Sequence, residues 1–82
     1  MNANIKYIDQ LVNHLLEQES PEKMEKALRD LLTSSELTDV ANRLQIFEML
    51  AQKIPQRQIA DKLGVGIATV TRGSNTLKGR ET

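Results

Sequence analysis

The sequence has 82 residues, no cysteine and a formal net charge of zero, with 39% hydrophobic and 27% charged side chains. A chain of this length forms one domain and buries only about 60 to 65% of the surface that its unfolded form exposes, so its own core is small. The absence of cysteine excludes disulfides and thiolate-bound metals, and sharing a core with a second copy is the usual remaining route to stability. We therefore expect a homo-oligomer.

No apolar run approaches the roughly 20 residues that span a bilayer, and the first residues, MNANIKYID, lack the apolar segment of a signal peptide. We expect a cytoplasmic protein without a membrane partner. The neutral total conceals an uneven charge distribution: residues 1–42 carry four basic and eight acidic side chains, and residues 43–82 carry seven basic and three acidic ones. Such segregation favours a polyanion-binding face in the second half, with ordinary solvated charge as the alternative.

Apolar residues recur at spacings of three and four in the first part of the chain. This pattern predicts helices over residues 5–16, from Pro21 to about residue 31, and from Thr33 to about residue 52. Ser20 before Pro21 is typical of a helix start, and Thr33 three residues before Glu36 matches a capping box. The apolar faces consist of Ile5, Ile8, Leu11, Val12, Leu15 and Leu16, then Met24, Ala27, Leu28 and Leu31, then Leu37, Val40, Ala41, Leu44, Phe47 and Leu50, widened by Ile46 and Met49.

Ile54-Pro55 interrupts this periodicity, because the residue before proline disfavours the helical region. A short helix is expected from Gln56 to Leu63, ended by Gly64, and another from about Ile67 to Lys78, followed by a frayed tail over residues 79–82. There is no strand candidate of any strength. The sequence predicts an all-α fold.

The segment QRQIADKLGVGIATVTR, residues 56–72, combines a short helix, a glycine-centred turn and a second helix, with apolar residues where the two helices must pack. This pattern is typical of a DNA-binding helix-turn-helix, whose second helix enters the major groove with its N-terminal residues facing the base edges. A plain helical hairpin is the alternative. Gly73 lies inside the second helix, where glycine costs about 1 kcal/mol relative to alanine. A neighbouring helix or a ligand therefore needs the space that a Cβ would fill.

Three segments resemble the tryptophan operon repressor family: LLTSSE at 31–36, ANRLQIFEML at 41–50 and PQRQIADKLGVGIATVTRGSNTLK at 55–78. The resemblance covers roughly residues 28–78, and the first 27 residues match only as an amphipathic helical arm. It implies a sequence-specific transcriptional repressor, an intertwined homodimer that binds a palindromic double-stranded DNA operator with L-tryptophan as corepressor. It also implies a dimerisation core over residues 1–52, a DNA-reading head over residues 55–78, and a further helix that packs on the core after Lys78, whereas the sequence stops at Thr82.

The resemblance assigns the two arginines that flank the indole ring, one from each subunit, to Arg43 and Arg72, and guanidinium groups can both stack on aromatic faces and pair with a carboxylate. The remaining tryptophan-binding positions that it implies are Gly73 beside the indole, Thr76 near the ligand, Thr33 at the carboxylate, and the carbonyls near Asp30 and Leu32 at the ammonium group. The DNA-binding positions are Gln56, Arg57, Gly66, Ile67, Ala68, Thr69, Thr71 and Lys78. Ala60 stands where some family members carry a basic residue that contacts DNA, which predicts a different base preference.

An enzyme is not expected. The sole histidine, His14, lies within the first helix, and the sequence shows no nucleophile elbow, phosphate loop or metal-ligand cluster. Two alternatives stay open: a tryptophan-independent regulator of the same helix-turn-helix type, and a helical dimerisation module. The joint presence of Arg43, Arg72, Gly73 and Thr76 counts against the first, and the basic second half of the chain counts against the second.

Overall fold

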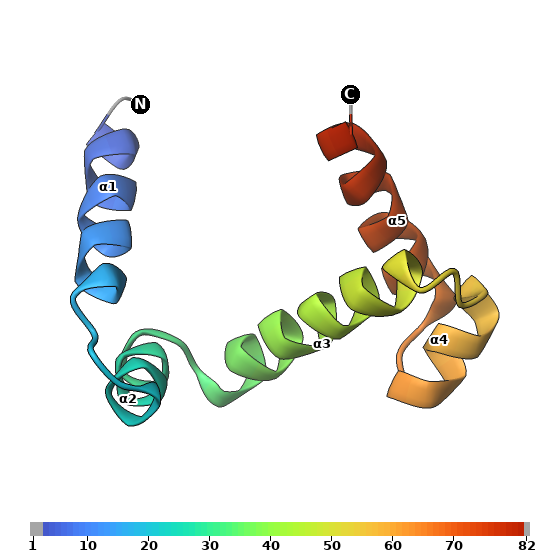
Figure 1. Cartoon of the computed structure of the whole chain (residues 1–82), viewed down its shortest axis with the longest axis horizontal. Helices are drawn as coiled ribbons and strands as arrows, with labels where there is room; N and C mark the ends of the chain where they lie inside the picture. The colour runs from blue at the N-terminus through green and yellow to red at the C-terminus, as the bar shows by residue number, and fades with distance from the viewer. Residues whose placement is uncertain (1–2, 82) are drawn as a thin grey trace. The chain divides into compact units, whose positions relative to one another are not determined.

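The computed structural model describes residues 3–81 of the chain, and the side chains of residues 5–79. These residues form five α-helices and contain no strand. The helices are α1 (Ala3–Leu16), α2 (Pro21–Leu31), α3 (Ser34–Ala51), α4 (Gln56–Leu63) and α5 (Ile67–Glu81) (Figure 1). The predicted all-α class is confirmed. The predicted tail after Lys78 is helical as far as Glu81, because neither a proline nor a residue with positive φ interrupts α5.

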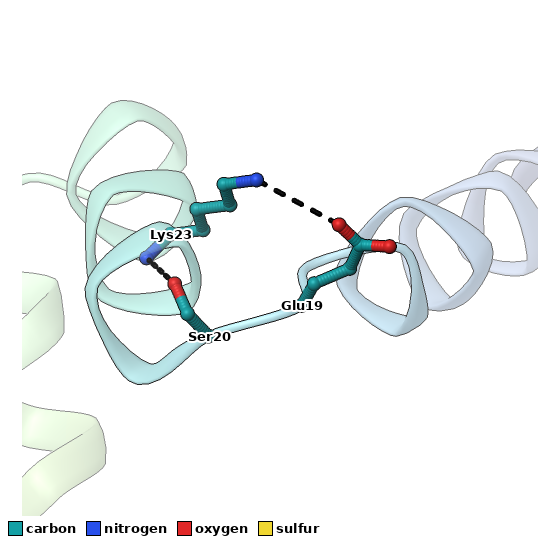
Figure 2. Close-up of polar contacts among 3 residues, drawn as sticks. All are labelled: Glu19, Ser20 and Lys23. Carbon is teal, nitrogen blue, oxygen red and sulfur yellow. Dashed lines mark hydrogen bonds and ion pairs between the residues drawn. The ribbon is translucent and has the colours of Figure 1, made fainter.

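The chain divides into two compact units, residues 1–37 and residues 38–82, which we describe separately. The boundary lies inside α3. In the first unit the predicted start of α2 is confirmed. Ser20 is its N-cap, and the Ser20 hydroxyl accepts from the Lys23 amide at 3.1 Å. Figure 2 shows this bond beside the ion pair between Lys23 Nζ and Glu19 Oε1, which lie 3.7 Å apart.

The capping box that the sequence predicts at the start of α3 is also present. The Glu36 amide donates to Thr33 Oγ1 at 3.1 Å, and the Thr33 amide donates to Glu36 Oε1 at 2.8 Å. Two amides that the helix leaves without a backbone acceptor are thereby satisfied. The bond uses Thr33 Oγ1 as an acceptor, so the hydroxyl hydrogen of Thr33 remains free to donate.

The apolar face of α1 is largely uncovered in the chain. Ile8 is 56% exposed, Leu11 43% and Leu16 75%, and only Leu15 on this face is half-buried. A shallow apolar hollow of about 340 Å³ adjoins this face and is lined by Val12, Leu15, Leu16, Gln18 and Met24. In α2 only Ala27 is buried, and Leu31, which the sequence pattern places on the same apolar face, is 51% exposed in the single chain.

The core of the second unit is made by Ile46, Ile59, Ala60 and Val70, with Met49, Leu50, Ile54, Leu63 and Val65 packed against it. Ile46, which the sequence pattern placed at the edge of the apolar face of α3, lies at the centre of this core and is 1% exposed. Val40 and Leu44, which belong to the apolar face predicted for α3, are 45% and 54% exposed. The reason is that α5 packs on the face of α3 that carries Ile46, which leaves the face with Val40 and Leu44 uncovered.

Residues in the left-handed conformation follow the ends of α3 and α4. Lys53 has a φ of 67°, and after it the Ile54 amide donates to the Met49 carbonyl at 3.1 Å. Gly64 has a φ of 68°, and its amide donates to the Ala60 carbonyl. The stop predicted at Gly64 is confirmed, whereas the left-handed conformation of Lys53 gave no signal in the sequence because lysine rarely adopts it.

Candidate functional site

The helix-turn-helix is built from α4, a turn at residues 64–66, and α5. Ile59 of α4 and Val70 of α5 are both 0% exposed, and the Val65 amide donates to the Ala60 carbonyl at 3.1 Å across the turn. Ala60 is 7% exposed, so its small side chain is part of the core. The residues that the sequence predicted for the packing of the two helices therefore form it.

The side chains predicted to contact DNA lie on the surface of this unit. Gln56 is half-buried, and the exposed members of the set are Arg57, Gly66, Ile67, Ala68, Thr69, Thr71 and Lys78. Ile67 is 49% exposed although it is apolar. Ile67, Ala68 and Thr69 form the first turn of α5. The Thr69 amide donates to the Gly66 carbonyl at 3.1 Å, and the helix dipole at this end favours an anion.

Two of these residues are joined to each other. The Thr71 hydroxyl donates to the Gln56 amide oxygen at 2.8 Å and so links the start of α4 to the second turn of α5. The bond fixes the plane of the Gln56 amide and leaves its NH₂ group free to donate. Phosphate oxygens and the major-groove edges of guanine, adenine and thymine all present acceptors.

A pocket of about 540 Å³ lies between α3 and α5 within the second unit. Its lining consists of Asp39, Asn42, Arg43, Ile46, Phe47, Val65, Thr69, Arg72, Gly73 and Thr76. Aromatic and apolar atoms from Phe47, Ile46 and Val65 thus face the same space as two guanidinium groups. Pockets of 300 to 1,000 Å³ with a few convergent polar groups are typical of small-molecule sites.

A family model described as Trp repressor protein matches residues 6–82. The chain is 52% identical over 60 residues to a Trp operon repressor homolog of Chlamydia trachomatis serovar D, an alignment that covers 67% of this chain and 64% of that protein. It is 45% identical over 69 residues to the homolog of Vibrio vulnificus strain YJ016, with 83% of this chain and 65% of that protein covered. The chain belongs to the Trp repressor family.

The match to the Trp repressor family begins at residue 6, well before residue 28, where the resemblance in the sequence becomes evident, and it therefore includes most of α1 and all of α2. The chain spans just under two thirds of the length of these two relatives. No solved structure matches the chain significantly.

Within one chain the pocket brings together four of the five residues that the resemblance to the Trp repressor family assigns to tryptophan: Arg43, Arg72, Gly73 and Thr76. Both arginines of the same chain thus line it, whereas the resemblance implies one arginine from each subunit. Thr33 belongs to the first unit and does not line it. The Thr76 hydroxyl donates to the Arg72 carbonyl at 3.1 Å, so its oxygen can still accept from a ligand. Thr69, assigned from the sequence to DNA alone, also lines the pocket.

Gly73 is explained by packing between helices. A Cβ built on Gly73 would lie 2.8 Å from Ile46 Cγ2 and 3.8 Å from Phe47 Cε1. Of the two explanations that the sequence left open, the neighbouring helix accounts for this glycine in the structure, since Ile46 fills the space. Gly73 also contributes to the wall of the pocket, so its contact with a ligand stays a prediction.

Sequence reasoning missed Asp39, Asn42 and Phe47 in the pocket. The signal that could have found Asp39 and Phe47 is their spacing of four residues from Arg43, because residues three and four positions apart share a face of a helix. Asn42 directly precedes Arg43, but it follows Asp39 by three residues and so shares a face with Asp39. Among the residues that the structure describes, no group of three or more histidine, aspartate or glutamate side chains could hold a metal ion. No helix in the same part of the chain is long and apolar enough to cross a membrane.

Proposed function

We propose that the chain is a sequence-specific DNA-binding repressor of transcription that acts as a homodimer and is activated by L-tryptophan. The observation that carries this proposal is that α5 belongs both to the helix-turn-helix and to the pocket against α3. Its first turns present small and hydroxylated side chains beside α4, and Arg72, Gly73 and Thr76 line a pocket against α3. A ligand in this pocket is therefore in a position to affect how α5 is held.

The exposed set at the start of α5 supports DNA as the partner. Gly66, Ala68 and Thr69 are small enough to let the backbone approach DNA, and threonine offers a hydroxyl to phosphate and a methyl group to thymine. Arg57 and Lys78 add positive charge that can pair with phosphates. The net charge of +4 over residues 43–82 favours the same partner.

The lining of the pocket supports tryptophan as the corepressor. Arg43 and Arg72 offer two guanidinium planes that can stack on an indole ring and pair with a carboxylate. The only ion pairs among the described side chains lie in residues 19–30, so neither arginine is tied to an acid of the chain. Both are therefore available to a ligand.

The uncovered face of α1 supports the homodimer. A second copy that buries Ile8, Leu11 and Leu16 would remove apolar surface from water, at about 25 cal/mol for each Å². Among the described side chains the only buried hydrophobic ones are Ala27, Ile46, Ile59, Ala60 and Val70, and a core of this size gains much from such pairing.

Titration calorimetry with L-tryptophan tests the corepressor. We expect saturable binding with one ligand per chain, and a folded dimeric sample that binds no tryptophan would refute activation by tryptophan while leaving DNA binding open. Binding to DNA is tested separately by competition between a palindromic duplex and random duplex, with and without tryptophan. Helix-turn-helix dimers, those of the Trp repressor family among them, bind half-sites about one helical turn apart.

Three outcomes of the competition experiment are informative. Preference for the palindrome only with tryptophan supports the full proposal. Preference without tryptophan would favour a tryptophan-independent regulator. Equal competition by both duplexes at physiological salt would leave only the nonspecific electrostatic term, and absence of any DNA binding would favour a dimerisation module.

A further inference from the structure

Asp39 places a negative charge in the pocket that otherwise carries two arginines. Asp39 lies in the second turn of α3, one helical turn before Arg43, and both side chains line the same pocket, as does Arg72 of α5. The net charge of these three groups is +1. A ligand in this pocket therefore meets both signs of charge.

Asp39 is not used as an internal counter-ion. An acid four residues before a base on a helix is well placed to form an ion pair. In α2, Glu25 pairs with Arg29 in this order at 2.8 Å, and Lys26 pairs with Asp30 at 2.8 Å with the base first. Among the described side chains no such bond joins Asp39 to Arg43 or to Arg72.

We infer that Asp39 binds the α-ammonium group of the ligand, which the resemblance assigns to the carbonyls near Asp30 and Leu32, residues that do not line this pocket, and thereby restricts the pocket to α-amino acids. This inference rests on the proposed function, in which the arginines bind the ring and the carboxylate. A carboxylate accepts hydrogen bonds from ammonium, and such charge-assisted bonds are stronger than neutral ones. The Thr76 oxygen, which retains acceptor capacity, lies in the same lining.

Asp39 also excludes competing ligands. With the arginines alone, the pocket would accept any planar aromatic carboxylic acid of suitable size. An acid without an ammonium group brings its negative charge into the pocket with nothing to neutralise Asp39. Uncompensated charge of this kind is a common means of rejecting a wrong ligand.

The test compares L-tryptophan with indole-3-propionate, which has the same ring and carboxylate but no ammonium group. Calorimetry on the full chain and on Asp39→Asn gives the affinity for each. We expect Asp39→Asn to bind tryptophan about tenfold more weakly, the scale of one hydrogen bond to a charged group. Its affinity for indole-3-propionate should be unchanged or higher. Asp39→Glu, which keeps the charge, should retain part of the preference for tryptophan.

Glu48→Gln is the matched control, because Glu48 is an exposed acid of α3 that does not line the pocket. It should leave both affinities unchanged. Equal weakening of both ligands by Asp39→Asn, or an unchanged affinity for tryptophan, would overturn the role of Asp39 and leave the proposed function intact. A parent chain that binds neither ligand would overturn activation by tryptophan and the inference with it.

Discussion

At the scale of single residues, Gly73 of α5 packs directly against Ile46 of α3. A methyl group on Gly73 would lie 2.8 Å from Ile46 Cγ2, and the Ile46 side chain is 1% exposed and branched at Cβ, so it has little freedom to move. We expect Gly73→Ala to lower the free energy of unfolding by about 1 to 3 kcal/mol, as overpacking does. Denaturant unfolding measures this change.

Gly79 provides the control for this prediction, since it lies in the same helix and a Cβ there would meet nothing within 4 Å. Gly79→Ala should raise the free energy of unfolding by up to about 1 kcal/mol, the difference in helix propensity between the two residues. Stabilisation by both substitutions would contradict the packing that we describe.

Thr71 and Gln56 are expected to act on DNA as a unit because of the 2.8 Å bond between them. Thr71→Val keeps the shape of the side chain and removes the donor, and Gln56→Ala removes the acceptor. If the bond orients the amide, the double variant should bind operator DNA about as weakly as Gln56→Ala alone, with a coupling of about 0.5 to 3 kcal/mol. Additive losses in a double-mutant cycle would mean two independent contacts.

Arg72 and Arg57 are both exposed and carry the same charge, yet we expect their loss to have different effects. Arg72→Ala should abolish the response of DNA binding to tryptophan, because Arg72 lines the pocket. Arg57→Ala should weaken DNA binding whether or not tryptophan is bound, because Arg57 is outside the pocket. Fluorescence anisotropy with labelled operator, with and without tryptophan, separates the two. A normal tryptophan response in Arg72→Ala would show that the pocket is assigned wrongly.

At the scale of the elements, the end of α3 carries a conformation that its residue does not favour. Lys53 has a φ of 67°, which costs an L-residue with a Cβ roughly 1 kcal/mol. We expect Lys53→Gly to raise the free energy of unfolding by up to that amount. Lys53→Ala removes the same charge without relieving the backbone and should not stabilise. Thermal and denaturant unfolding of the two variants, measured side by side, decides between them.

The helices and their caps could be predicted because they depend on near neighbours in the sequence. Ser20 with Pro21, Thr33 with Glu36, and Gly64 each act over one helical turn, and the structure contains all three. Which face of α3 is buried depends on where α5 packs, and this contact is not visible in the spacing of apolar residues within α3. The pattern therefore placed Ile46 at the edge of the apolar face, although Ile46 is its most buried member. The same dependence explains why Asp39 was missed.

At the scale of the whole molecule, the apolar residues of α1 predict that the chain pairs. Ile8 is 56% exposed, so Ile8→Lys should leave the fold of the single chain intact and raise the dissociation constant of the dimer. Gln10→Lys, which adds the same charge at another exposed position of α1, should change it little. Sedimentation velocity over a range of concentrations measures both. Unaltered pairing in Ile8→Lys would place the interface elsewhere.

The exposed apolar face of α1 has a consequence for the cell. If only the paired chain binds the operator, the amount of active repressor rises with the square of the chain's abundance when most chains are single. A twofold fall in the synthesis of the chain then reduces the amount of active repressor by up to fourfold, even at a constant concentration of tryptophan. The hydrophobic residues of one N-terminal helix would thus set the number of copies that a cell must keep to hold its genes silent.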